Sequence, residues 1–221
     1  QHTLIHVSEV DYIIEEDLPL PEIKTKQSTE TEIAIAGHIA EMIGDGACLQ
    51  LGQGGLADAV GDNLLHAGKK DLGFASELIT NSSVRLLEAG VLNNSKKKLY
   101  PGKITGAMVS GDQALWRYVH RNPGILMFEV EWTNDIRTIA MNDNVVSINS
   151  ALEVDLTGQV CSESIGYRQF AATGGQFEWV MGSQLSKGGK SIIAINSSYI
   201  DKQGVRRSKI KPILTPGAVV T

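Results

Sequence analysis

Two patterns of apolar residues alternate along most of the chain: spacing of three to four residues, typical of helices, and short unbroken apolar runs, typical of buried strands. Residues 28–44 show the first pattern. Thr29 and Glu32 have the spacing of a capping box that opens a helix. The apolar residues that follow share one face of this helix: Ile33, Ala36, Ile39, Ala40 and Ile43. The run 47–51 shows the second pattern and predicts a short strand.

The alternation continues to residue 195. Further strands are predicted at 71–76, 104–109, 125–130, 144–156, 158–162 and 191–195, with a hairpin turn at Thr157 and Gly158. Further helices are predicted at 56–65, 82–89, 113–120 and 176–185, and a basic hairpin is predicted at 202–211. Strands and helices that alternate in this way favour an α/β fold of Rossmann-like type, an open, mainly parallel sheet with helices on both faces.

The first 27 residues follow neither pattern regularly. Residues 5–14 are rich in strand-forming side chains, and an acidic stretch with Pro19 and Pro21 follows. We expect a short strand and then an arm from a preceding domain, so that 1–27 is a linker and 28–221 a domain. The chain starts without Met, which we interpret as a start in the middle of a longer protein.

Composition narrows the class of protein. The 221 residues are 42% hydrophobic and 20% charged, as in an ordinary globular domain. A net charge of −5 argues against a nucleic-acid partner, and no apolar run is long enough for a membrane span. Two cysteines, Cys48 and Cys161, are too few for a disulfide framework, so we expect a cytoplasmic protein. The five histidines have no metal-ligand spacing, so no metal site is predicted.

A glycine-rich turn follows the first predicted strand of the domain. Gly52 to Ala57 fits G-x-G-x-x-A, which exposes backbone amides at a helix start, and Glu77 lies twenty residues beyond Ala57. Together they have the spacing of a dinucleotide-binding fingerprint. The alternative is that these glycines only allow the strand and the helix to pack closely.

Glu77 directly follows the apolar run 72–75. Ligands of open α/β sheets bind at the carboxyl ends of strands, and a carboxylate among Phe74, Leu78 and Ile79 is poorly solvated and therefore a better nucleophile or base. The alternative is a solvated carboxylate, or a partner for the helix that starts near Ser82.

A second glycine pair, Gly174 and Gly175, opens the helix predicted at 176–185. Backbone amides here could face a developing oxyanion, or the pair could be a flexible helix entry. Arg168 could bind an anion or form a surface ion pair. The Lys96-Lys97-Lys98 run is typical of a solvated turn. From the residues alone, a dinucleotide domain and a thioester or acyl-transfer site both stay open.

Seven motifs, in order along the chain, resolve this choice by resemblance. They are LQLGQGG (49–55), ASEL (75–78), LYPGK (99–103), NDNVVSINSALEVDLTGQV (142–160), TGGQ (173–176), LSKGGK (185–190) and LTPGA (214–218). With them, the chain resembles the acetyl-CoA hydrolase/transferase family of CoA-transferases, in the branch that acts on 4-hydroxybutyrate or on butyrate and acetate. The resemblance also covers HVSEVDY (6–12), a stretch that precedes the family's C-terminal domain.

The resemblance implies roles for particular residues. Glu77 matches the family's catalytic glutamate, and the CoA-binding positions match Gly54, Gly55, Leu56, Ala57, Asp58 and Leu152. Gly174 and Gly175 match the glycines of the oxyanion hole and CoA contact. The chain departs from the family at Glu178, where Asp is usual, and at Thr173, where Val or Ile is frequent.

The implied reaction transfers CoA between carboxylic acids by a ping-pong mechanism through a glutamyl-CoA thioester, with CoA thioester as substrate and no cofactor. The implied partners are an acyl-CoA, a small carboxylic acid, an N-terminal domain outside this chain and further copies of the protein in a homo-oligomer. Residues 28–221 would then be a catalytic domain that is incomplete at its end. An acyl-CoA hydrolase and a nucleotide-binding module remain as alternatives.

Overall fold

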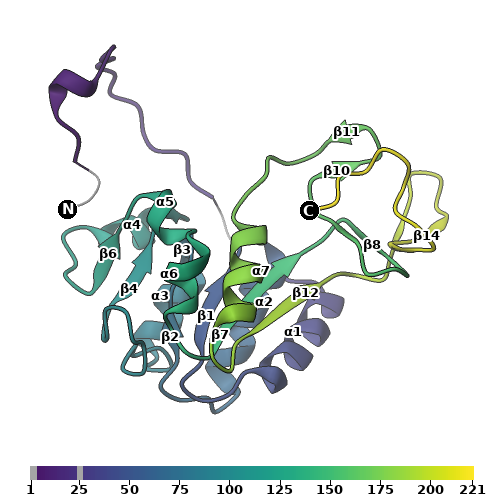
Figure 1. Cartoon of the computed structure of the whole chain (residues 1–221), viewed down its shortest axis with the longest axis horizontal. Helices are drawn as coiled ribbons and strands as arrows, with labels where there is room; N and C mark the ends of the chain where they lie inside the picture. Colours follow the sequence, from purple (N-terminus) through teal and green to yellow (C-terminus); the bar gives the residue numbers. More distant parts are fainter. Residues whose placement is uncertain (1–3, 24–26) are drawn as a thin grey trace.

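A four-stranded parallel sheet, in the order β12-β7-β1-β2, forms the centre of the computed structural model, which describes residues 4–23 and 27–221 (Figure 1). Its strands are β1 (Cys48–Leu51), β2 (Gly73–Phe74), β7 (Val145–Ser150) and β12 (Lys190–Ala194). The register pairs Leu49 of β1 with Phe74 on one side and Val146 on the other. The expected mainly parallel α/β fold is therefore confirmed.

Shorter parallel pairs extend this centre. They are β3 (Leu78–Thr80) with β5 (Met108–Ser110), and β4 (Ile104–Gly106) with β6 (Ile125–Met127). A single bridge between Ala75 and Thr105 connects the end of β2 to β4. The helices are α1 (Glu30–Met42), α2 (Gly55–His66), α3 (Asn81–Glu88), α4 (Gln113–Val119), α5 (Val130–Thr133), α6 (Ile136–Ala140) and α7 (Gln176–Leu185).

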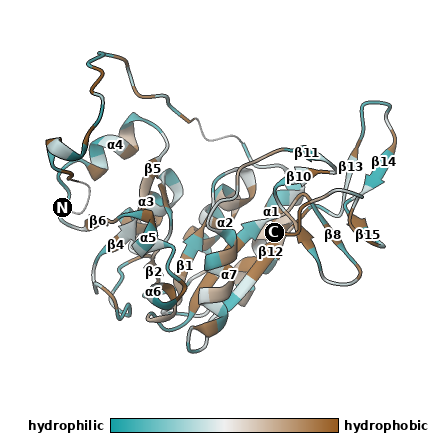
Figure 2. Ribbon diagram, turned by 45° about the horizontal axis from the view of Figure 1, so that its top comes forward, coloured by the Kyte–Doolittle hydropathy of each residue, from teal (hydrophilic) through white to brown (hydrophobic). Residues whose placement is uncertain are grey.

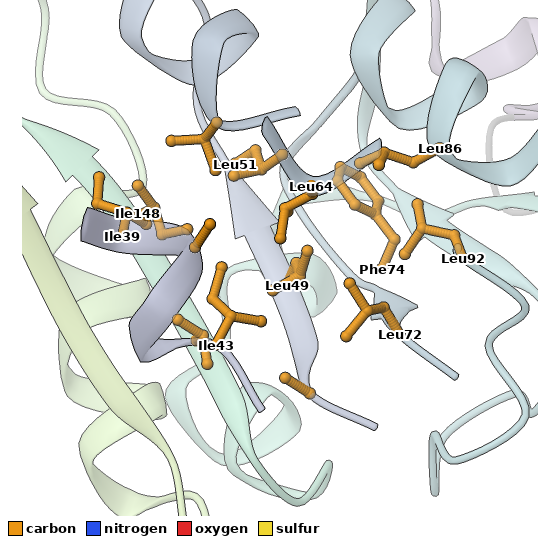
Figure 3. Close-up of a cluster of buried hydrophobic side chains, with 14 of the residues drawn as sticks. Ile39, Ile43, Leu49, Leu51, Leu64, Leu72, Phe74, Leu86, Leu92 and Ile148 are labelled. Carbon is orange, nitrogen blue, oxygen red and sulfur yellow. The ribbon is translucent and has the colours of Figure 1, made fainter. Parts of the chain in front are cut away.

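Helices cover both faces of the central sheet, because neighbouring residues of β1 point to opposite sides. Leu49 and Leu51 belong to the large apolar core, which also takes in buried residues of α1 and α2. Figure 3 shows this core around Leu49, Leu64 and Phe74. Cys48 belongs instead to a smaller cluster with Ile139 of α6 and Trp179 of α7. Alternation of side chains along one strand thus assigns α1 and α2 to one face and α6 and α7 to the other.

The capping box at the start of α1 forms as predicted. The Thr29 hydroxyl accepts a hydrogen bond from the Glu32 amide at 3.2 Å, and the Glu32 carboxylate accepts one from the Thr29 amide at 2.8 Å. The predicted apolar face is buried, except that the first residue, Ile33, is half exposed. Helix α7 has the predicted bounds and begins directly after Gly175.

Residues 153–169 and 198–211 form small sheets beside the central one. The predicted hairpin consists of β8 (Glu153–Asp155) and β9 (Val160–Cys161), with β15 (Ile210–Lys211) parallel to β8. The basic hairpin consists of β13 (Ser198–Ile200) and β14 (Arg206–Ser208), and β10 (Ser164–Ile165) pairs with β11 (Arg168–Gln169). Figure 2 shows hydrophilic residues on β14 and hydrophobic residues along much of β12.

Four sequence predictions of structure are wrong. The strand expected at 144–156 is two strands, because β7 ends at Ser150 and β8 begins at Glu153. Residues 5–14 form no strand: the segment contains the 3-10 helix η1 (Val7–Glu9) and is mostly exposed. The expected strand at 104–109 is two strands, because β4 and β5 pair with different partners. The strand expected at 125–130 ends at Met127, and α5 begins at Val130. Residues 1–3 and 24–26 of the expected arm lie outside the described residues.

Lys97 is buried, contrary to the solvated turn expected for its run. Its ammonium group donates to the carbonyl oxygens of Phe74 at 2.9 Å and Lys103 at 2.8 Å, and to the Thr105 hydroxyl at 3.2 Å. Burial lowers the pKa of Lys97 to about 8, against an opposing effect of nearby Cys48. Lys97 therefore links β2 to β4, and its contact on β2 is Phe74, shortly before Glu77 in the sequence.

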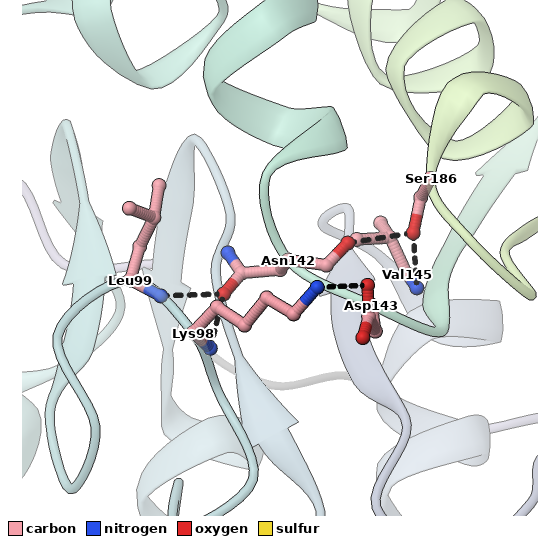
Figure 4. Close-up of polar contacts among 6 residues, drawn as sticks. All are labelled: Lys98, Leu99, Asn142, Asp143, Val145 and Ser186. Carbon is pink, nitrogen blue, oxygen red and sulfur yellow. Dashed lines mark hydrogen bonds and ion pairs between the residues drawn. The ribbon is translucent and has the colours of Figure 1, made fainter.

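Asn142, in the longest motif of the resemblance, connects three segments (Figure 4). Its side-chain oxygen accepts the amides of Lys98 and Leu99, both at 3.0 Å. Its carbonyl accepts the hydroxyl of Ser186 at 2.7 Å, and that hydroxyl in turn accepts the Val145 amide. The motif thus fixes the start of β7 to the end of α7.

In the described part of the chain, no helix is both long enough and apolar enough to span a bilayer.

Candidate functional site

A cavity of about 290 Å³ opens where β1 and β7 end. Of the residues predicted for the site, it is lined by Glu77, Leu56, Ala57, Gly174 and Gly175. The helix starts of α2 and α7 and the connection from β2 to β3 supply these residues. Segments more than a hundred residues apart in the sequence therefore meet at the carboxyl edge of the sheet, where α/β folds bind ligands.

Glu77 lies between β2 and β3, and its backbone is held in place. Its carbonyl oxygen accepts the amides of Ala107 at 3.0 Å and Met108 at 2.9 Å. The preceding residue, Ser76, donates its hydroxyl to the carbonyl of Leu51 at 3.0 Å. The Glu77 side chain is half buried and lines the cavity. It does not act as a cap for α3, because Thr80 caps that helix.

An amide side chain fixes the carboxylate of Glu77. Asn134, directly after α5, donates its Nδ2 to the Oε2 of Glu77 at 2.9 Å. The Oδ1 of Asn134 accepts the indole Nε1–H of Trp179 at 3.1 Å, which fixes which end of the amide faces Glu77. Trp179 is 2% exposed, so its position is set by packing. Trp179 therefore holds the amide of Asn134, and Asn134 holds one oxygen of the Glu77 carboxylate.

Gly175 packs directly against these groups. A Cβ atom at this position would collide with the Glu77 carboxylate and would lie 2.5 Å from the Asn134 amide nitrogen. A Cβ at Gly174 would meet nothing within 4 Å. The backbone at Gly175 can therefore approach Glu77 only because the residue has no side chain.

Three predicted residues, Gly54, Gly55 and Asp58, line a second cavity of about 570 Å³ on the other side of the glycine-rich turn. Gly54 has φ +115°, a conformation that favours glycine. A Cβ at Gly55 would lie 2.7 Å from the Glu32 carboxylate. Partial burial raises the pKa of Asp58, opposed by Arg85 and reinforced by Asp62. The carboxylates of Glu32 and Asp58 thus both lie at the start of α2, and their negative charge disfavours a phosphate there.

Leu152 is not among the residues that line either cavity, so the structure does not bring it to Glu77. Its amide donates to the carbonyl of Cys161 at 2.8 Å, across the base of the β8–β9 hairpin. Arg168 is exposed on β11 and lines neither cavity.

Sequence reasoning missed several residues of the cavity region. Asn134 contacts Glu77 across 57 positions, and no local pattern marks it. Glu163 lines the cavity, is 7% exposed and accepts the Thr173 hydroxyl at 2.8 Å. Gln50 and Asn149, from β1 and β7, bond through their side-chain amides at the cavity wall. Only Gln50 could have been noticed in the sequence: it is a polar residue in an otherwise apolar strand, and a buried amide needs hydrogen-bond partners.

Within the described ranges 4–23 and 27–221, no group of three or more His, Cys, Asp or Glu side chains could hold a metal ion. Cys48 and Cys161 are both buried free thiols there, and burial raises the pKa of Cys48 to about 11.

Comparison with models of known protein families identifies the family of this chain. Residues 111–221 match the family model of the acetyl-CoA hydrolase/transferase C-terminal domain. The chain therefore belongs to the acetyl-CoA hydrolase/transferase family, as its motifs suggested.

Two curated relatives are 47% identical to the chain. One is succinyl-CoA:cyclohexane-1-carboxylate CoA transferase of Geobacter metallireducens, matched over 98% of this chain and 48% of the relative. The other is 4-hydroxybutyrate coenzyme A transferase of Clostridium kluyveri, matched over 99% of this chain and 50% of the relative. The chain thus spans about half the length of the curated relatives it matches.

Solved structures agree on the fold. RipA from Yersinia pestis is 38% identical with a TM-score of 0.85, over 98% of this chain and 48% of that one. The 4-hydroxybutyrate CoA-transferase from Porphyromonas gingivalis is also 38% identical, with a TM-score of 0.79, over 97% of this chain and 50% of that one.

Proposed function

We propose that this chain carries the nucleophile of a CoA-transferase that moves coenzyme A between an acyl-CoA and a short-chain carboxylate such as acetate, butyrate or 4-hydroxybutyrate. The observation that carries the proposal is the Glu77 carboxylate, held by Asn134 at 2.9 Å and closed in by the backbone of Gly175. The names of the relatives, all CoA transferases, support the reaction class.

In the proposed reaction, Glu77 acts as a covalent catalyst. A carboxylate oxygen attacks the thioester carbonyl, the carbon–sulfur bond breaks, and an acyl-glutamyl anhydride and CoA thiolate result. The thiolate then attacks the glutamyl carbonyl, which releases the first acid as its carboxylate and leaves a glutamyl-CoA thioester. An acceptor carboxylate reverses both steps and receives the CoA. No net proton is taken up, and the proposal needs no metal or redox cofactor.

The surrounding residues have matching tasks in this proposal. A carboxylate is a weak nucleophile, so its free oxygen must be aimed at the carbonyl, and Asn134 supports this by holding the other oxygen. Backbone amides at Gly174 and Gly175 would stabilise each tetrahedral oxyanion. The glycine-rich turn with Leu56 and Ala57 would contact the CoA arm, together with Gly54, Gly55 and Asp58 on its other side. The part of the relatives that this chain does not span would supply the rest of the site.

A kinetic comparison tests the proposal. The chain is joined to the segment that corresponds to the half of its relatives that it does not span, and this longer protein is called the joined protein. The joined protein is assayed with butyryl-CoA, with and without acetate. The proposal expects acetyl-CoA formation, parallel lines in double-reciprocal plots, and loss of transfer by at least a thousandfold in Glu77→Gln. Thioester loss that does not require acetate would favour the acyl-CoA hydrolase instead. Full transfer activity in Glu77→Gln would overturn the proposed role of Glu77, and NAD binding without CoA binding would favour a nucleotide-binding module.

A further inference from the structure

Glu163 is a second carboxylate in the cavity wall, and the proposed reaction does not use it. It is 7% exposed and lines the same cavity as Glu77. No Lys, Arg or His lies within ion-pair distance of it in the part of the chain that the structure describes. A buried carboxylate without a cationic partner is costly, so the contacts that it does make are informative.

In the described part of the chain, the hydrogen bonds of Glu163 go to the segment that leads into the glycine pair. Its carbonyl oxygen accepts the amides of Phe170 at 2.7 Å and Ala171 at 3.0 Å. Its carboxylate accepts the hydroxyl of Thr173 at 2.8 Å. Backbone and side chain of one residue therefore hold residues 170–173 from the same side.

Within the described residues, this segment has one other hydrogen bond before α7: the side-chain amide of Gln169 donates to the carbonyl oxygen of Ala171 at 2.6 Å. It leaves the short β10–β11 hairpin at Gln169, and residues 170–174 are exposed. Its far end is fixed at Gly175, whose carbonyl accepts the Trp179 amide at 3.0 Å and whose backbone packs on Glu77 and Asn134. Of the contacts of residues 170–173, the hydrogen bond from Thr173 to Glu163 is the one next to the glycine pair, so it directs the chain into Gly174 and Gly175.

We infer that Glu163 is a positioning residue for the glycine pair: through Thr173 it fixes the backbone of Gly174 and Gly175 beside the carboxylate of Glu77. The inference rests on the proposed function for its catalytic consequence.

The chain provides a matched control for this contact. Glu153 and Thr215 form a second buried-carboxylate pair, in which the Thr215 hydroxyl donates to Glu153 at 2.8 Å and the Thr215 amide donates at 2.7 Å. Neither residue lines the cavity of Glu77. Loss of the Thr215 hydroxyl therefore removes the same kind of hydrogen bond, from a hydroxyl to a buried carboxylate, at a place that does not line the Glu77 cavity.

The experiment compares Thr173→Val, Thr173→Ser and Thr215→Val in the joined protein. Valine keeps the volume of threonine and removes the donor, and serine keeps the donor. A hydrogen bond to a charged group of this kind corresponds to roughly tenfold in rate. Thr173→Val is expected to lower kcat about tenfold with KM for acyl-CoA within about twofold, and Thr173→Ser to stay within about threefold of the parent.

Glu163 itself is tested by Glu163→Gln, which keeps an acceptor oxygen but loses the charge, so its kcat should fall between those of Thr173→Ser and Thr173→Val. Glu163→Ala should lose at least as much as Thr173→Val. Thr215→Val should leave kcat within about twofold. Wild-type kcat in Thr173→Val, or equal losses of kcat in Thr173→Val and Thr215→Val, would overturn the inference.

Hydrogen exchange separates this inference from the proposed function. Thr173→Val should speed exchange of the amides at 170–175 and leave those at 153–161 unchanged. That difference is independent of any reaction. If it is absent, the inference fails; if wild-type protein shows the protection but transfers no CoA, the proposed function fails instead.

Discussion

Gly175→Ala gives the sharpest test of how the site is built. The new Cβ would lie 2.5 Å from the Asn134 amide nitrogen and closer still to the Glu77 carboxylate, whereas ordinary contacts begin at 3.4 Å. Asn134 must therefore move by about 0.9 Å and Glu77 by more, and both are side-chain ends that can give way. A displacement of about 1 Å at a reacting group corresponds to roughly a hundredfold loss of rate.

The neighbouring glycine provides the comparison. Neither Gly174 nor Gly175 has a positive φ, and a Cβ at Gly174 meets nothing within 4 Å. Both variants are assayed for kcat with butyryl-CoA and acetate, and for urea-induced unfolding. We expect Gly175→Ala to lose about a hundredfold in kcat and about 1 kcal/mol in stability, and Gly174→Ala to lose at least tenfold less activity. Equal losses in the two variants, or an active Gly175→Ala, would refute the steric reasoning.

Three other variants test a contact of Glu77, a buried lysine and the apolar core. Asn134→Ala removes a hydrogen bond to a charged oxygen, so we expect kcat to fall roughly tenfold to a hundredfold, and unchanged kcat would show that Glu77 needs no such support. The pKa of Lys97, lowered to about 8, means that the unfolded chain binds more protons than the folded one between pH 8 and 10.5. Urea titrations should therefore show this contribution to stability rising from pH 8 to 9. The raised pKa of Cys48 offsets part of the rise, because the thiol of the unfolded chain begins to ionise in this range, and the rise should be absent in Lys97→Met. Leu49→Ala in the fully buried core should cost about 2–5 kcal/mol, and a loss below 1 kcal/mol would contradict the packing described.

Local features of the sequence predict local structure. Thr29 and Glu32 define the start of α1 because a capping box needs only four residues, and the glycine pair marks the start of α7. The position of Glu77 at a strand end also follows from neighbouring residues. These predictions succeed because all the interacting groups lie within one turn or one strand.

Longer-range pairing explains the misses. Residues 104–109 read as one strand, yet Gly106 lies against the side chain of Ile79, and the chain changes partner there from β6 to β3. Residues 5–14 have strand-forming side chains but no partner strand in the described structure. Lys97 sits in a run of three lysines, and only the fold brings carbonyl oxygens around its ammonium group.

The site divides in the same way. Glu77 and the glycines were found from motifs, whereas Asn134 and Glu163 were not, because each acts through a residue on another element. Leu152 was placed in the site by resemblance and lies outside the cavity lined by Glu77. A motif identifies residues, and the fold decides which of them meet.

The central claim is that Glu77 forms a covalent bond in the reaction. Peptide mapping by mass spectrometry, after brief incubation of the joined protein with acyl-CoA and trapping with borohydride or hydroxylamine, measures this directly. The account predicts modification at Glu77, as the alcohol or hydroxamate derived from a glutamyl-CoA thioester, and none in Glu77→Gln. A protein that transfers CoA at full rate with Glu77 unmodified, or with the label on another residue, would contradict it.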